Sequence, residues 1–232
     1  MRRRQVGFRD DRDLTAAGSI TGLYAITAPR RAGQSGLLDA AAATLGAGAR
    51  VLQYRDKSDD ADRRLTEATA LAALCRQHGA AFIINDDVDL ALQANADGVH
   101  VGRDDAGVAR ARSALGPGRV LGVSCYADLD RAGAAVEAGA DYLAFGSVYP
   151  SPTKPQAGLA PLDILAEARR RFALPVVAIG GITADNIGEV TAAGADAVAV
   201  VDAVFGADDP AAATRVLIEQ GFGASAAAPA AH

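Results

Sequence analysis

The segment Gln53-Tyr54-Arg55-Asp56-Lys57 places an amide and two cations at every second position. If this segment ends a strand, alternate side chains share one face. Gln53, Arg55 and Lys57 would then point to the same place. An amide and two cations that converge suit a phosphate or a pyrophosphate. The alternative is that these side chains are only the solvated end of a strand.

Acidic residues form a second candidate group, in two segments of the chain. The first segment is Asn85-Asp86-Asp87 and the second is Arg103-Asp104-Asp105. Carboxylates that meet can hold a hard cation through oxygen, and Mg²⁺ bridging to phosphate oxygens is the expected ion. The alternative is that some of these aspartates cap the helices that follow them. Both interpretations can hold together, because a cap needs only one Asp per segment.

Three later segments could hold a second phosphate or the same one. Ser151-Pro152-Thr153-Lys154-Pro155 offers two hydroxyls and an ammonium on a stretch that its prolines stiffen. Gly180-Gly181-Ile182-Thr183 and Val201-Asp202-Ala203 offer backbone N–H groups that a phosphate could approach closely. A plain Pro-rich turn is the alternative for the first segment.

The distribution of lysine supports this selection of residues. Of the 23 basic residues, 21 are Arg and only Lys57 and Lys154 are Lys. Both lysines stand in the segments described above. His100 could also line a site, although a packed histidine fits equally well. Cys125 has no evident base to activate it, so we interpret it as a wall residue and not as a nucleophile.

These segments follow short apolar runs, each with the length of a buried parallel strand. The expected strands are residues 22–27, 50–54, 81–85, 98–101, 120–124, 142–146, 175–180 and 197–201. The expected helices between and after them are residues 37–45, 59–77, 88–94, 106–115, 129–138, 162–171, 184–192 and 210–219. Eight such units predict an α/β fold of one domain, a (β/α)₈ TIM barrel, in which the strand C-termini carry the site. A doubly wound open sheet is the second choice.

A repeated signal marks the junctions from helix to strand. Gly or Asn followed by Ala stands there five times, at Gly48, Gly79, Asn95, Gly139 and Gly194. Gly and Asn suit the left-handed residue that closes a helix. The dinucleotide fingerprint is missing, because Gly46-Ala47-Gly48 ends a helix and follows no strand.

Composition excludes several classes of protein. The 232 residues carry a net charge of -5 and little aromatic character, which argues against nucleic-acid partners. The longest uncharged stretch, residues 14–29, contains Thr, Gly, Ser and Pro and is a poor membrane span, which argues against a membrane partner. Two cysteines exclude a disulfide scaffold and indicate a reducing, cytoplasmic location. We expect an N-terminal arm at 1–20, the barrel at 21–220 and a Gly/Ala-rich disordered tail at 221–232. No secretory signal is expected, and a homo-oligomer is left open.

Taken together and in order, the motifs resemble the thiamine-phosphate synthase (thiamine-phosphate pyrophosphorylase) family, a family of TIM barrels. The resemblance covers residues 22 to about 219 and adds Ala96-Asp97-Gly98-Val99-His100 and Leu121-Gly122-Val123-Ser124 to the segments above. Its implied reaction joins 4-amino-5-hydroxymethyl-2-methylpyrimidine pyrophosphate to 4-methyl-5-(2-hydroxyethyl)thiazole phosphate. The implied products are thiamine phosphate and pyrophosphate.

The resemblance also implies roles for single residues. The pyrophosphate of the pyrimidine substrate would be held by Gln53, Arg55, Lys57, Asn85, Ser124 and Lys154. Asp86 and Asp105 would ligate Mg²⁺. The thiazole phosphate would be held by Ser151, Thr153, Gly181 and the backbone of Val201 and Asp202. Among these, Arg55, Lys57, Ser124 and Lys154 would act in catalysis.

Two positions depart from the family pattern. Arg103 stands where Gln is usual, and Asp202 stands where Ser is common. An ionised carboxylate cannot donate a hydrogen bond to phosphate. Asp202 therefore either weakens the thiazole phosphate site or turns away to cap a short turn at 203–205, and we favour the cap.

Three other functions remain as alternatives. A thiazole tautomerase on the same barrel would need a general acid or base near the thiazole, and it has no evident use for the cations and acidic segments. A non-catalytic phosphate-ligand-binding barrel would be expected to lack the charged residues of the mouth. Another phosphate-binding barrel enzyme, such as an isomerase, rests on analogy of fold alone.

Overall fold

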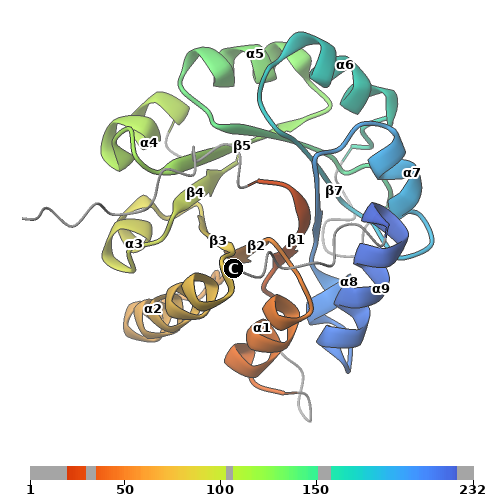
Figure 1. The fold of residues 1–232 in the computed structure, drawn as a ribbon. Coiled ribbons are helices and arrows are strands. Elements are labelled where there is room, and N and C mark those ends of the chain that lie inside the picture. The colour runs from red at the N-terminus through yellow and green to blue at the C-terminus, as the bar shows by residue number, and fades with distance from the viewer. Residues whose placement is uncertain (1–19, 30–34, 103–106, 151–157, 224–232) are drawn as a thin grey trace, which may run out of the picture.

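A computed structural model describes residues 20–29, 35–102, 107–150 and 158–223. Eight parallel strands close into a barrel in chain order, with β1 pairing both β2 and β8. Helices surround the strands as an outer ring (Figure 1). The predicted (β/α)₈ barrel is therefore confirmed, and the open sheet is excluded.

The element bounds follow the predicted pattern. The strands are β1 Gly22–Ile26, β2 Val51–Tyr54, β3 Ala81–Asn85, β4 Gly98–Val101, β5 Val120–Tyr126, β6 Tyr142–Phe145, β7 Val176–Ile179 and β8 Ala197–Val200. The helices are α1 Leu37–Gly46, α2 Ala61–His78, α3 Val88–Gln93, α4 Val108–Leu115, α5 Leu129–Glu137, α6 Asp163–Arg171, α7 Ile187–Ala192, α8 Asp202–Phe205 and α9 Pro210–Phe222.

Several boundaries differ from the prediction by a few residues, among them the start of α7 at Ile187 in place of 184. Three further differences concern the ends of the barrel and the site. A short helix, α8, follows β8 and was expected only as a turn. Helix α9 continues through Phe222, past the expected barrel end at 220. Helix α4 begins after Gly107, which occupies its N-cap position without a side-chain bond. The cap position is thus Gly107, whereas Asp104 and Asp105, for which a capping role was suggested, lie outside the described residues.

The strands separate two apolar cores. Side chains facing inward fill the barrel, among them Ile26, Ile83, Val177 and Ala199. Side chains facing outward pack against the helices, among them Leu52. This alternation is the period of two that a strand imposes. It means that a residue's parity within its strand decides whether it reaches the barrel interior.

The junctions between helices and strands are built as predicted. All five junction residues have positive φ, at Gly48, Gly79, Asn95, Gly139 and Gly194. An aspartate then follows three of these junctions, and its carboxylate accepts the N–H of a neighbouring strand. These bonds join Asp97 to Phe82, Asp141 to Leu121 and Asp196 to Val176, at 2.7–2.9 Å. The carboxylates at this end of the barrel stabilise the fold, so the chemistry is expected at the opposite end.

Among the described residues, no helix has the length and the apolar character that crossing a membrane requires.

Candidate active site

A cavity of about 460 Å³ opens at the C-terminal ends of the strands. Its floor is formed by side chains inside the barrel and its walls by the ends of the strands and the loops that follow them. The polar residues lining it are Tyr24, Gln53, Arg55, Asn85, His100, Ser124, Tyr126, Tyr142, Ser147, Thr183 and Asp202. This is the end of the barrel at which the sequence places the site.

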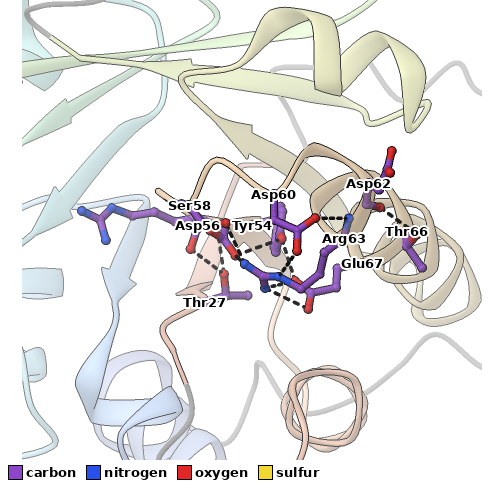
Figure 2. A network of polar contacts seen from close by, with 10 residues as sticks. Thr27, Tyr54, Asp56, Ser58, Asp60, Asp62, Arg63, Thr66 and Glu67 are labelled. Carbon is purple, nitrogen blue, oxygen red and sulfur yellow. Dashed lines mark hydrogen bonds and ion pairs between the residues drawn. The ribbon is translucent and has the colours of Figure 1, made fainter.

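The end of β2 divides its side chains between two faces. Gln53 and Arg55 line the cavity. Tyr54 points the other way and donates to Glu67 on α2 at 2.6 Å, while Asp56 pairs with Arg63 at 2.7 Å (Figure 2). The alternation predicted from the sequence is therefore present. The outward side chains anchor the strand end to α2, which holds Arg55 at the cavity.

This anchor has a clear electrostatic character. Partial burial alone would raise the pKa of Asp56, but hydrogen bonds from Ser58 and Arg63 bring it below its usual value. Burial and the neighbouring Glu67 carboxylate raise the pKa of Tyr54. Tyr54 therefore remains a neutral donor and Asp56 an ionised acceptor at neutral pH.

Lys57 reaches the acidic end of β3. Its Nζ forms an ion pair with Asp86 Oδ2, and Asn85 Nδ2 donates to the same oxygen at 2.6 Å. The Lys57 side chain is 59% exposed and that of Asp86 is 25% exposed. Asp86 has φ of +65°, a conformation that Asp and Asn tolerate better than most residues. Asn85 lines the cavity, and the carboxylate of Asp86 and the ammonium of Lys57 lie beside it.

The adjacent carboxylate has a structural role. Asp87 Oδ1 accepts the N–H of Leu90 at 2.9 Å as the cap of α3, and Oδ2 pairs with Arg64 at 2.8 Å. The capping interpretation therefore holds for Asp87, which leaves Asp86 as the metal candidate of this segment. Within the described ranges, no three His, Cys, Asp or Glu side chains gather as a metal-binding group.

A chain of hydrogen bonds crosses the cavity floor. Gln53 Nε2 donates to Tyr24 Oη at 2.6 Å, and Tyr24 Oη lies 2.9 Å from Tyr142 Oη. Tyr142 Oη lies 2.8 Å from His100 Nδ1, and His100 Nε2 lies 2.9 Å from Ser124 Oγ. Five strands contribute one residue each. Two predicted site residues, Gln53 and Ser124, form the ends of this chain.

Gly122 allows two members of this chain to meet. On β5 it is the register partner of His100 on one side and of Tyr142 on the other. A Cβ at Gly122 would lie 2.0 Å from Tyr142 Cζ. Because no side chain stands there, the His100 and Tyr142 rings can stack with centroids 5.5 Å apart.

We expect Gly122→Ala to destabilise the protein by about 1–3 kcal/mol, because the added methyl overpacks the barrel interior. Gly133→Ala is the matched control. Gly133 lies in helix α5, and a Cβ there would meet only Phe172 Cε1, at 4.0 Å. Ala in a helix interior is more stable than Gly by about 0.5–1 kcal/mol. Urea unfolding of both variants measures the difference. Equal stability of Gly122→Ala and the parent would contradict the close approach.

The loops after β7 and β8 form the opposite wall of the cavity. Gly180, Gly181, Val201 and Asp202 all line it. A Cβ at Gly181 would lie 2.4 Å from the Pro150 carbonyl oxygen, and Gly181 has φ of +65°, so no other residue fits without rearrangement. The loop brings backbone groups to the cavity surface, as the sequence predicts.

Asp202 does not cap α8. It is the first residue of that helix, the N-cap position belongs to Val201, and no side-chain cap bond is made there. The favoured capping interpretation is therefore wrong in this form. Asp202 is exposed and lines the cavity. A carboxylate in the first turn of a helix still interacts favourably with the helix dipole.

Four predicted site residues and one departure lie outside the described residues: Asp105, Ser151, Thr153, Lys154 and Arg103. Residues 1–19 of the arm expected at 1–20 and most of the expected tail also lie outside them.

The interpretation of Cys125 as a residue of the cavity wall is wrong. Cys125 is buried in the core between strands and helices, and burial raises the pKa of its thiol to about 12. It therefore offers no thiolate to a substrate.

Two residues of the cavity floor were not predicted from the sequence. Tyr24 and Tyr142 are both within 1% of complete burial, yet their hydroxyls point into the cavity floor. The only sign of them in the sequence was that each is a tyrosine at an inward position of a strand that is otherwise apolar. His100, left undecided, lines the cavity with both ring nitrogens hydrogen-bonded.

The fold and the site together define a (β/α)₈ barrel enzyme whose mouth presents a cation, a carboxylate and glycine loops to an anionic substrate. Comparison with known proteins narrows this class. The family described as Thiamine monophosphate synthase matches residues 23–204. The chain belongs to this family. It is an enzyme, a transferase, and its activity is that of a thiamine-phosphate synthase.

Individual relatives agree with the family assignment. The thiamine-phosphate synthase of Halorhodospira halophila is 57% identical over 201 residues, which are 87% of this chain and 94% of that protein. That of Chromobacterium violaceum is 55% identical over 198 residues, covering 85% and 95%. The solved thiamine phosphate pyrophosphorylase from Pyrococcus furiosus superposes with a TM-score of 0.78 at 34% identity and covers 89% of this chain and 96% of that chain.

Proposed function

We propose that the enzyme joins an aminopyrimidine methyl pyrophosphate to a thiazole phosphate in two steps, with the residues of the cavity acting on the leaving group. The observation that carries this proposal is the polarity of the cavity: hydrogen-bonding groups lie at its floor, and Arg55 and Asn85 line it at the ends of β2 and β3. The ion pair of Lys57 and Asp86 adjoins Asn85, which donates to Asp86. A flat ring bearing a charged pyrophosphate has the same polarity.

The placement of Gln53 changes one expected role. Its side chain is 3% exposed and its amide bonds to Tyr24 on the floor, away from the ion pair of Lys57 and Asp86. A pyrophosphate would be poorly solvated there. We therefore propose that the Gln53 amide meets the aminopyrimidine ring and that Arg55, Lys57, Asn85 and Ser124 meet the pyrophosphate. An amide can accept from the exocyclic amine and donate to the adjacent ring nitrogen.

In the first step the bond between the pyrimidine methylene carbon and the pyrophosphate oxygen breaks, and the electron pair leaves with the oxygen. Arg55, Lys57 and Lys154 would neutralise the charge that grows on pyrophosphate. The electron-rich aminopyrimidine stabilises the cation that remains. In the second step the lone pair of the thiazole nitrogen forms the new C–N bond.

No protein nucleophile is required by this sequence of steps. The buried thiol of Cys125 faces the helix layer, as described above. Ser124 bonds to His100, but the proposed reaction uses its hydroxyl as a donor to pyrophosphate. Aminopyrimidine and thiazole therefore react directly.

One described carboxylate, that of Asp86, is a suitable ligand for Mg²⁺. The Asp86 carboxylate is partly exposed and is of the oxygen type that hard cations take. We propose that Asp86 and Asp105 hold the ion, which when bound supplies further charge neutralisation to the pyrophosphate. Lys57, already paired with Asp86, would lie next to the same oxygens.

The thiazole phosphate is assigned to the opposite wall. Gly181 and the backbone at Val201 and Asp202 line that wall, and the glycine permits close approach. Asn186 fixes the loop by accepting the Thr183 N–H at 2.8 Å and donating to the Gly181 carbonyl at 3.1 Å. Ser151 and Thr153 are proposed to complete this site.

The remaining proposals concern where and with whom the enzyme acts. Its substrates are small molecules. We propose a cytoplasmic enzyme without nucleic-acid or membrane partners, because its net charge is -5 and its two cysteines are unpaired. Assembly as a homo-oligomer is compatible with this function.

A coupled assay for pyrophosphate release tests the proposed function. We expect release only when both substrates and Mg²⁺ are present, with thiamine phosphate formed in equal amount. Conversion of a thiazole isomer without pyrophosphate release would instead support a tautomerase. Binding of the substrates without turnover would support a non-catalytic barrel.

Asp202 allows a test of the phosphate wall. Because Asp202 is exposed, solvent screens its charge, and we expect Asp202→Ser to change the KM for thiazole phosphate by less than about tenfold, or ~1.4 kcal/mol. Asp208→Ser, an exposed change after α8, serves as the control. A much larger fall in KM would show that Asp202 repels the phosphate and that the enzyme is adapted to a different thiazole partner.

A further inference from the structure

The chain of hydrogen bonds on the cavity floor has a direction as well as a shape. We propose that the Gln53 amide sets this direction, so that His100 carries its proton on Nε2 and the Ser124 hydroxyl is left to donate to bound substrate. The inference deepens the proposed function and rests on it only for what Ser124 meets. Tyr24, Tyr142 and His100 are then positioning residues that act through Ser124.

The direction follows from counting protons. Gln53 Nε2 donates to Tyr24 Oη, so the Tyr24 hydroxyl is already an acceptor there. Its one proton must go to its other partner, Tyr142 Oη. The Tyr142 proton in turn goes to His100 Nδ1, which must be unprotonated to accept it.

The last link delivers a donor to the cavity. With Nδ1 unprotonated, a neutral His100 carries its proton on Nε2 and donates it to Ser124 Oγ. The Ser124 proton is then not needed within the chain and can face the cavity that Ser124 lines. Pyrophosphate oxygens only accept hydrogen bonds, so a serine held in this state matches them.

The opposite direction is consistent only if Gln53 turns its amide over. The side-chain carbonyl oxygen of Gln53 would then accept a hydrogen bond from Tyr24, and every later bond would reverse. Ser124 would donate its one proton to His100 Nε2 and would have none for the substrate. Mixed directions leave a buried proton without an acceptor, which costs about 1–3 kcal/mol. All the hydrogen bonds therefore reverse together or not at all. Gln53 is the residue at one end of them that is proposed to contact the aminopyrimidine.

Burial leaves these side chains dependent on one another for hydrogen bonds. Tyr24, Gln53 and Tyr142 are 3% exposed or less, so water does not replace a missing partner. Burial also raises the pKa of both tyrosines, which keeps each hydroxyl protonated and able to donate once. Among the described residues, the partners named above account for the hydroxyls of both tyrosines.

The ¹⁵N NMR spectrum of the histidine ring tests the direction in the substrate-free protein. The protein has three histidines, and the set of signals that is lost in the His100→Gln variant belongs to His100. Protonated and unprotonated ring nitrogens resonate far apart. At a pH where the histidines are neutral, we expect His100 to show a protonated Nε2 and an unprotonated Nδ1. A protonated Nδ1 would overturn the proposal.

Two variants test which end sets the direction. Tyr142→Phe removes the donor to Nδ1, so we expect its ring signals to move toward the average of the two tautomers. Ser124→Ala removes only the acceptor at the far end, so the Nε2–H signature should remain. The reverse result, with Ser124→Ala alone shifting the signals, would overturn the proposal. Tyr54→Phe, which removes a buried hydroxyl bonded to Glu67, is the control and should leave His100 unchanged.

Kinetics of pyrophosphate release give a second readout. We expect Tyr142→Phe and Ser124→Ala each to lower kcat about tenfold or more, since each removes the same hydrogen bond to a charged group. The double variant should be no slower than Ser124→Ala within about threefold. Full additivity would mean that Tyr142 acts independently of Ser124. Because the NMR experiment needs no turnover, an inactive protein would refute the proposed function without deciding the direction of the chain.

Discussion

Asp86→Asn is expected to lower turnover at least ~100-fold, because the charge that develops on the leaving group is then less well stabilised. Asn keeps the shape of the side chain and tolerates the positive φ of position 86, whereas Ala would add backbone strain. The variant therefore removes charge alone. We also expect excess chelator to stop turnover of the parent enzyme and added Mg²⁺ to restore it.

The control for Asp86 is its neighbour on the same segment. Asp89 lies three residues further along the chain, exposed in the first turn of α3. Asp89→Asn should retain at least half of the parental kcat and the same Mg²⁺ requirement. Steady-state rates of pyrophosphate release over a range of Mg²⁺ concentrations measure all of these effects. Full activity in excess chelator, or a parental rate for Asp86→Asn, would refute the metal assignment.

The fold was predictable because its signals are local. Each strand is a short apolar run, and each junction residue such as Gly79 or Asn95 reports its own backbone conformation. Helix α8 was not predicted as a helix because four residues are too few to show a period. The start of α4 was missed because Gly107 stands after two stronger cap candidates, Asp104 and Asp105.

Cavity-lining residues were predictable where the sequence of a single strand was enough to give the direction of its side chains. Alternation along 53–57 gave the inward direction of Gln53 and Arg55 from parity alone. The same rule could have corrected Cys125, since Ser124 faces inward and its neighbour must face outward. Contacts between strands were not predictable. Tyr24 and Tyr142 are 118 positions apart, and only the closed barrel brings their hydroxyls to 2.9 Å.

Lys57→Arg is expected to reduce kcat by about 10–100-fold and to raise the KM for the pyrimidine substrate by less than threefold. The ammonium of Lys57 is a compact charge already paired with Asp86. A guanidinium is planar and longer, so it keeps the charge but places it differently. The charge it must meet develops on pyrophosphate during bond breaking, which is why the loss should fall on kcat. Lys154→Arg is expected to behave in the same way.

The control exchanges the same two residue types at an ion pair outside the cavity. Arg64 pairs with Asp87 at 2.8 Å and does not line the site. Arg64→Lys should leave kcat and KM within twofold of the parent, whatever it does to stability. Initial rates over a range of pyrimidine substrate separate kcat from KM for each variant. If Lys57→Arg raised KM and left kcat intact, Lys57 would bind the ground state only, and Arg55 and Lys154 would have to neutralise the leaving group without it.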